Sequence, residues 1–457
     1  MRDIASALII PLAVVCARFD AIAQSQPTAR AIEEKLVAQV DFSTLIEQSF
    51  LVSHDGRRIE YRIHKEGKQS VVVDGQEEKL FDSVSIPIFS PDSRHTAYIA
   101  RDGRNWGVVL DDTVIGSHDT VVALRGLRFS PDGKHIAYLA DLGAKQFVVT
   151  NGKRGKSYDR IDEGSIVFRP DTQLVAYAAQ ETTSHFVVAG DVEGKGHADV
   201  GNLVISSDER RMMYSAEDHG KRFVVIDGMA GKEYDMVTSL SFTPDSRRTA
   251  YVAAQNGKWF LVLDGQEQKP YDLVTSLIIS PDSKRVAYGA QTDGIPVVVV
   301  DGAETGAHDG VLEGSIRFSP DSRHVAYEEE IHDEFFMVVD GKEGKHYDAI
   351  LNTTIMFSPD GTHLVYVAEK EGKRLVVTDE TEGMAFDYVF TPVYSPNGKR
   401  LAYTAQQRDR FFVVVDGRKG DSYDGIVGEG VVFDSDDRMH YLVLKVANIN
   451  LIEERLP

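Results

Sequence analysis

Residues 271–302 read YDLVTSLIISPDSKRVAYGAQTDGIPVVVVDG, and this stretch contains the pattern that recurs along the chain. Short runs of β-branched and apolar residues alternate with the polar sequences Ser-Pro-Asp-Ser and Asp-Gly. Such runs between turn-forming residues are typical of β-strands, and four short strands fit in one copy. The copies lack helical periodicity, so the stretch predicts a small antiparallel sheet.

A tyrosine in the second strand marks the same place in eleven copies, at intervals of 37 to 40 residues. A period this regular indicates one supersecondary unit repeated along the chain. A four-stranded unit cannot bury its own faces, so it must stack on its neighbours, and twisted sheets repeated around an axis close into a β-propeller. The marking residues are Tyr61, Tyr98, Tyr138, Tyr177, Tyr214, Tyr251, Tyr288, Tyr327, Tyr366, Tyr403 and Tyr441.

The sequence therefore predicts an all-β protein, a β-propeller of about eleven four-stranded blades, built as one large ring or as two fused rings. We assign residues 42–457 to the repeat array and 24–41 to a short N-terminal segment. The last copy lacks a fourth strand after residues 449–451, and residues 37–46 could supply it. Pairing between the two ends of the chain would close the ring and cover two exposed sheet edges.

Two further columns follow the same period. The third strand ends in Asp-Gly or a related pair, which favours tight hairpin turns. An aromatic residue followed by aspartate comes next, with histidine in the aromatic place at His118 and His308 and alanine at Ala198 before Asp199. The aromatic pairs are Phe81-Asp82, Tyr158-Asp159, Tyr234-Asp235, Tyr271-Asp272, Tyr347-Asp348, Phe386-Asp387 and Tyr423-Asp424.

The N-terminus carries a different signal. Residues 4–17 are an apolar run broken only by Ser6 and Pro11, and residues 21–23 read Ala-Ile-Ala, which fits a cleavage site. Residues 1–23 are therefore predicted to be a secretory signal peptide, because the run is shorter than the roughly 20 residues that span a bilayer. A membrane anchor and a lipid on Cys16 are the alternatives. The only cysteine, Cys16, would be removed with this segment, which excludes disulfides and thiol chemistry in the mature chain.

The formal net charge of −21 bears on partners. Phosphate backbones need a cationic surface, so a nucleic-acid partner is excluded. Cationic partners, metal ions and simple solubility remain open. With the signal peptide, the composition predicts a periplasmic or secreted protein whose mature chain does not span a membrane and whose partner is another envelope or secreted protein.

The repeat resembles the TolB-like, WD-repeat-like β-propellers of exported bacterial proteins. The resemblance rests on Phe129-Ser130-Pro131-Asp132-Gly133-Lys134 before Ala137-Tyr138, and on the equivalent turns over roughly residues 42–452. It implies a propeller fold and little about activity, since one fold hosts many functions. The chain departs from TolB because residues 24–40 are too few for the α/β domain that precedes the TolB propeller.

The aspartates after the aromatic residues are candidate ligand or partner residues. If they faced the axial channel they could concentrate cations or hold a basic partner. The alternative, which we favour, is that each carboxylate accepts backbone N–H bonds at the start of a strand. The candidates are Asp82, Asp119, Asp159, Asp235, Asp272, Asp309, Asp348, Asp387 and Asp424.

Positions where one copy deviates are the second class of candidates. His118 and His308 could hold a divalent metal, as histidines do in propeller lyases that resemble this repeat family, and His197 and His346 lie within one or two positions of the same column. These four copies are not adjacent, and the alternative is that the histidines are solvated or hydrogen-bonded. The tract Glu328-Glu329-Glu330 could bind a cation but is better explained as a solvated acidic hairpin. No Gly-x-Ser-x-Gly elbow occurs, which argues against a serine hydrolase.

The function predicted from the sequence is an exported, non-enzymatic scaffold for protein or ligand interaction, without a cofactor other than a possible divalent cation. The alternative is a metal-dependent lyase or hydrolase that acts on a carbohydrate-like ligand in the channel.

Overall fold

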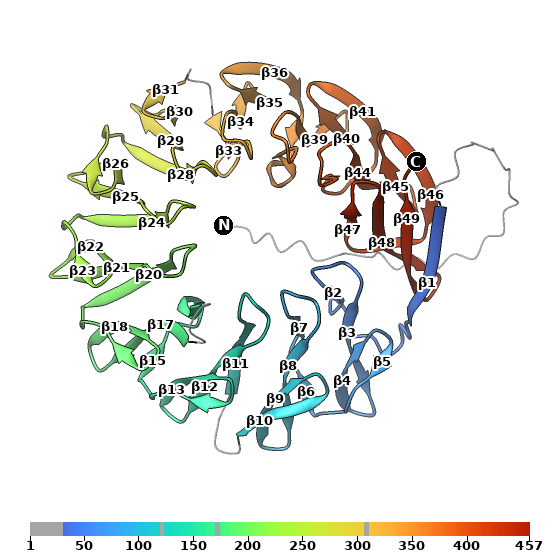
Figure 1. Ribbon diagram of the computed structural model, residues 1–457, viewed down its shortest axis with the longest axis horizontal. Helices are drawn as coiled ribbons and strands as arrows, with labels where there is room; N and C mark the ends of the chain where they lie inside the picture. The colour runs from blue at the N-terminus through green and yellow to red at the C-terminus, as the bar shows by residue number, and fades with distance from the viewer. Residues whose placement is uncertain (1–30, 119–122, 170–173, 306–309) are drawn as a thin grey trace, which may run out of the picture.

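The computed structural model describes residues 31–118, 123–169, 174–305 and 310–457, and these form eleven antiparallel sheets arranged as one ring (Figure 1). The prediction of a β-propeller with eleven blades is confirmed, and the single ring replaces the alternative of two. In chain order the blades span residues 51–77, 83–118, 123–154, 160–193, 199–230, 236–267, 273–304, 310–347, 349–386, 388–423 and 425–455.

Blade 6 shows the architecture of one unit. Its strands β24 (Met236–Phe242), β25 (Thr249–Gln255), β26 (Lys258–Leu263) and β27 (Gln266–Glu267) pair antiparallel in chain order, with β24 nearest the ring centre (Figure 1). The register of β24 shifts between Thr238 and Ser241, where Ser239 has a φ of 53°. This bulge bends the inner strand, as bulges do at sheet edges. In other blades the inner strand is split, as in β6 (Ser83–Val84) and β7 (Ile88–Phe89).

Blade 11 joins the two ends of the chain. Strands β47 (Gly425–Ser435), β48 (Arg438–Lys445) and β49 (Asn448–Arg455) come from the C-terminus, and β1 (Ala31–Gln39) adds the outermost strand (Figure 1). The predicted pairing of the chain ends is therefore confirmed, with Ala31 opposite Arg455 and Gln39 opposite Asn448. The predicted bounds were wrong. The strand ends before residue 40 rather than covering 37–46, so the propeller includes residues assigned to a separate N-terminal segment.

The hydrophobic core lies between the blades. All eleven marking tyrosines are buried, with 1 to 4% of their surface exposed. At the seam between blades 5 and 6, Tyr234 meets the ring of Tyr251 edge-on at a centroid distance of 6.3 Å, in one cluster with Met213 and Val262. Each sheet thus buries its faces on its two neighbours, as the repeat required.

The Asp-Gly pairs form the predicted hairpin turns. Asp227 and Gly228 have φ values of 51° and 82°, and Asp264 and Gly265 have 50° and 76°. Two consecutive positive φ angles define the type I′ turn, whose twist matches that of the flanking strands. Asparagine, aspartate and glycine are the residues that tolerate this conformation, which explains the composition of the column.

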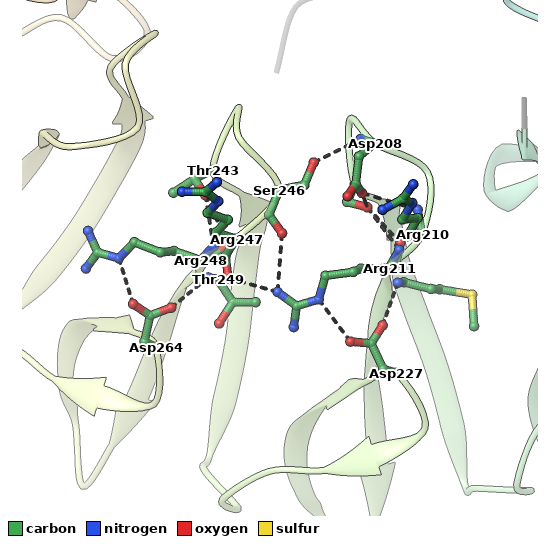
Figure 2. Close-up of polar contacts among 12 residues, drawn as sticks. Asp208, Arg210, Arg211, Asp227, Thr243, Ser246, Arg247, Arg248, Thr249 and Asp264 are labelled. Atoms are coloured by element: carbon green, nitrogen blue, oxygen red, sulfur yellow. Dashed lines mark hydrogen bonds and ion pairs between the residues drawn. The ribbon is translucent and has the colours of Figure 1, made fainter.

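The turn aspartate also starts a connection between blades, which Figure 2 shows for blades 5 and 6. Asp227 accepts the Met212 N–H at 2.9 Å with one oxygen and pairs with the Arg211 guanidinium at 3.0 Å with the other. Arg211 then donates to the backbone carbonyls of Ser246 and Arg247 on the next blade. The Ser246 hydroxyl in turn accepts the Asp208 N–H at 2.9 Å. Neighbouring blades are therefore joined by polar contacts as well as by the core.

Replacing Arg211 with alanine is expected to lower the free energy of unfolding by about 1–3 kcal/mol, because a charged donor and its bonds across the seam are lost. The matched control is Arg210→Ala in the same turn. Arg210 is exposed and forms no ion pair within the described residues, so its loss should cost under about 0.5 kcal/mol. Urea unfolding of both variants checks this, and equal effects would contradict the structural role of Arg211.

Candidate functional site

The candidate aspartates hold hairpins of their own blades. In each described blade with the motif, the carboxylate accepts a backbone N–H from the turn between the second and third strands, as the favoured alternative predicted. Asp119 and Asp309 lie outside the described residues. The bonds are Gly103 to Asp82, Thr182 to Asp159, Asn256 to Asp235, Asp293 to Asp272, Glu371 to Asp348, Arg408 to Asp387 and Val446 to Asp424, at 2.5 to 2.8 Å.

The other carboxylate oxygen usually meets a cation from the preceding blade. Lys145 of blade 3 lies 2.9 Å from Asp159 at the start of blade 4, and Lys221 of blade 5 lies 2.6 Å from Asp235 at the start of blade 6. The Thr182 N–H, and then Lys145, hold the pKa of Asp159 below its ordinary value. These contacts account for the column structurally. Its predicted role in ligand or partner binding stays a prediction.

At the end of blade 4 the aromatic-aspartate column lies one residue earlier in the sequence than predicted. His197 forms the backbone bridge to His185 that Tyr158 forms to Gln146, so His197 occupies the aromatic place and Ala198 the aspartate place. Assigning Ala198-Asp199 to the column was therefore wrong. The carboxylate comes instead from Asp218 in the hairpin, which accepts the Ala198 N–H and lies 2.8 Å from His197 Nδ1. The hairpin is therefore still bonded to the column position, but here the hairpin residue Asp218 accepts and the backbone N–H of Ala198 donates.

His118, the described member of the predicted metal pair, lies on β10 (Thr113–His118), the outer strand of blade 2. Its Nε2 is 2.9 Å from the Tyr138 hydroxyl, and its ring packs edge-on against Tyr138 and Phe147 of blade 3. His308 lies outside the described residues. Within the ranges that the structure describes, no group of three or more metal-ligating side chains comes together. The predicted metal site stays a prediction, and its His118 ligand belongs to a seam between blades.

The acidic tract of blade 8 differs from its prediction. Glu328 and Glu329 lie on β34 (Val325–Ile331) and are 0% and 1% exposed, so a solvated hairpin is wrong for both. The turn is made instead by His332 and Asp333, with φ values of 51° and 64°. Burial raises the pKa of Glu328 to about 8 and that of Glu329 to about 7. Strand position therefore determines the burial of these side chains.

Glu60 on β3 (Ile59–Lys65) is a similar group that the sequence reading missed. It is fully buried, both of its carboxylate oxygens lack a hydrogen-bond partner within the described residues, and burial raises its pKa to about 8. It stands directly before Tyr61, where most copies have alanine. An acidic residue in this column, which is apolar in every other copy except for His440 in the last, was the signal available in the sequence.

Two cavities open at seams between blades. The larger, about 320 Å³, lies between blades 7 and 8, and its lining includes Leu273, Pro296, Leu312, Glu313 and Ile316. Leu273 is 41% exposed, and Ile295 beside Pro296 is 52% exposed. The smaller cavity, about 160 Å³, lies between blades 4 and 5. Neither was predicted, because strand patterns do not show where two sheets fail to fill the space between them.

The sequence matches no protein-family model and no curated protein sequence. Among solved structures it is similar to the β-propeller domain of the Trilobed protease from Pyrococcus furiosus, with 12% identity over 56% of this chain and 92% of that chain, at a TM-score of 0.28. It is also similar to TolB from Acinetobacter baumannii, with 12% identity over 72% and 79% of the two chains, at a TM-score of 0.26.

A third similar structure is a putative TolB from Agrobacterium tumefaciens, with 13% identity over 50% of this chain and 93% of that chain, at a TM-score of 0.25. At these scores the assignment of the fold rests on the eleven sheets of the ring themselves. Within the described residues, no helix has the length and apolar character needed to cross a membrane.

Proposed function

We propose that the protein is an exported, non-enzymatic scaffold that binds another protein at the cavity between blades 7 and 8. The observation that carries the proposal is the apolar lining of this cavity, where Leu273 is exposed and Pro296 and Leu312 lie beside it. Exposed apolar side chains beside a hollow are typical of interaction sites. Sheets that are joined through side chains at many seams give such a site a rigid support, which lowers the entropic cost of binding.

Charge suggests the character of the partner. The chain has 71 acidic and 50 basic residues, and Glu313 lines the cavity itself. A partner that presents an apolar side chain surrounded by lysine or arginine would complement this surface, and the complementary charges would speed association at low salt. The proposed partner is therefore an envelope or secreted protein with a basic contact face.

Export is the part of the proposal that concerns residues 1–23, which lie outside the described residues. It is supported by their apolar run and by the Ala-Ile-Ala sequence before Gln24. Intact mass spectrometry of protein recovered from the periplasm or the medium tests it. A mature chain that begins at Gln24 supports export, whereas a full-length chain found only in the cytosol contradicts it.

The interaction is tested by placing a photo-crosslinking residue at position 273 in the natural host. We expect one discrete crosslinked species, and we expect Leu273→Glu or Leu312→Glu to weaken binding of the identified partner at least about tenfold, since each buries a charge in an apolar contact. Val446→Glu is the matched control, because Val446 is an exposed apolar residue of blade 11, 84% exposed. Equal effects at the three positions, or no crosslink at position 273, would contradict the proposal.

A further inference from the structure

Three seams of the ring are closed by the same three side chains. At the seam of blades 3 and 4, the Glu193 carboxylate accepts from Lys156 Nζ at 2.6 Å and from the Tyr158 hydroxyl at 2.9 Å. Glu267 accepts from Lys232 beside Tyr234 at the seam of blades 5 and 6, and Glu304 accepts from Lys269 and Tyr271 at the seam of blades 6 and 7. Each lysine also lies over the tyrosine ring, at 5.2 to 5.3 Å from its centroid.

The seam between blades 4 and 5 lacks two of these three groups. Strand pairing identifies the equivalent positions, because Ala230 pairs with Val225 as Glu193 pairs with Val188 and Glu267 with Val262. His197 takes the place of the tyrosine, as its bridge to His185 shows. Lys195, two residues before His197, takes the place of Lys156. The cation is kept here, and the glutamate that binds it elsewhere has become alanine.

The 160 Å³ cavity lies at this seam and is lined by Lys195, His197, Tyr214 and Ala230, among others. Its volume is several times the roughly 30 Å³ that a water molecule occupies in the liquid. No carboxylate of the described residues lies within 4 Å of Lys195 Nζ, although its charge helps to lower the pKa of Asp218. The cavity therefore lies at the position that a glutamate side chain occupies at the seams of blades 3 and 4, 5 and 6, and 6 and 7.

Lys195 makes the cavity suitable for an anion. Its ammonium is a donor of the kind that forms charge-assisted bonds to carboxylates, and Lys195 lines the cavity. His197 Nδ1 is held by Asp218 at 2.8 Å, so Nε2 is the ring nitrogen left for a ligand. Asp218 is itself an anion, but its two oxygens are bound by His197 Nδ1 and by the Ala198 N–H.

The rest of the cavity is apolar. Val187, Val192 and Val225 line it, and Met229, which is largely exposed, stands between the lining residues Gly228 and Ala230. A ligand with one carboxylate and a short hydrocarbon chain would match both the Lys195 ammonium and the apolar lining. We propose that the seam between blades 4 and 5 is a binding site for a small aliphatic monocarboxylate, whose carboxylate replaces the glutamate of the sibling seams.

The test uses sodium butyrate as the probe, with isothermal titration calorimetry on the mature chain. We expect saturable binding of butyrate, and at least about tenfold weaker binding of the uncharged butyramide. Ala230→Glu should weaken butyrate binding by at least about tenfold, because a tethered carboxylate then occupies the site as Glu193 does at its seam. Lys195→Met should do the same by removing the cation. Lys195 is exposed, so this variant keeps the fold.

The matched control is Lys232→Met at the seam of blades 5 and 6, where Glu267 already occupies the equivalent space. Butyrate affinity should be unchanged in this variant. The proposal is overturned if wild-type protein shows no binding up to about 10 mM butyrate, which corresponds to less than about 3 kcal/mol of binding free energy. It is equally overturned if Ala230→Glu binds butyrate as the wild type does, or if butyramide binds as tightly as butyrate.

Discussion

A chain without residues 31–40 is expected to lose at least about 5 kcal/mol of its free energy of unfolding and to self-associate. These residues supply β1, whose pairing with β49 covers the edge of blade 11. They also place Ala38 and Val40 in a core cluster with Tyr61 and Leu442. Several sheet hydrogen bonds at about 1 kcal/mol each and two buried apolar side chains together reach this magnitude.

Urea unfolding measures the loss, and light scattering measures the association that an uncovered strand edge promotes. A synthetic peptide of residues 31–40, added in trans, should restore both the stability and the monomer, whereas a scrambled peptide should not. A truncated chain that unfolds at the wild-type urea concentration would show that the ring does not depend on the closing strand.

Replacing Glu328 with glutamine is expected to raise the free energy of unfolding by several kcal/mol at pH 8.5 and to change it little at pH 4.5. Both carboxylate oxygens of Glu328 are buried without a hydrogen-bond partner in the described residues, and burial raises its pKa from about 4.5 to about 8. The nearby charge of Glu330 acts in the same direction.

The sign follows from the protons bound in each state. Between pH 4.5 and pH 8 the folded chain keeps a proton on Glu328 that the unfolded chain has released. The stability this contributes is complete below pH 4.5 and is lost as the pH rises through 8, at about 1.4 kcal/mol per pH unit. Glutamine has nearly the same shape as glutamate and carries no charge, so the variant does not lose stability as the pH rises.

Urea unfolding at pH 4.5, 6, 7 and 8.5 tests this, with Glu371→Gln in an exposed hairpin as the control. The control should follow the wild-type pH dependence, and Glu328→Gln should have a shallower one. Parallel curves for all three proteins would mean that Glu328 is ionised in the folded state, and the assigned burial would be wrong.

Periodicity predicted the blades because the residues that repeat are those that pack. The tyrosines are buried at the seams, and the Asp-Gly pairs adopt a positive φ in the turns. Each of these roles is met by few residue types, so the repeat can be recognised in the sequence. The closing strand was found in outline and misplaced, because Glu33, Glu34 and Lys35 give β1 no apolar alternation. An outermost strand meets water on its exposed edge, so its sequence carries little pattern.

The predictions within the repeat array were wrong where the usual environment of a residue type differs from the environment of its position in the blade. Glutamates were read as solvated because glutamate usually is, yet Glu328 and Glu329 follow the marking Tyr327 directly on the second, buried strand. The cavity at the seam of blades 4 and 5 was visible in principle, since Ala230 stands in a column that has glutamate in the following two blades. Finding it required a comparison among copies rather than along the chain.

The pairing of Ala31 with Arg455 also sets an order of events in time. The first strand of the ring to leave the ribosome pairs with the last, and at about 5–20 residues per second the intervening chain takes roughly 20–80 s to synthesise. Until then β1 lacks its strand partner β49, although Ala38 can already pack against Tyr61 of blade 1. The growing ring is an open arc with an unfinished end throughout synthesis, and a helper that shields this end would act in that interval.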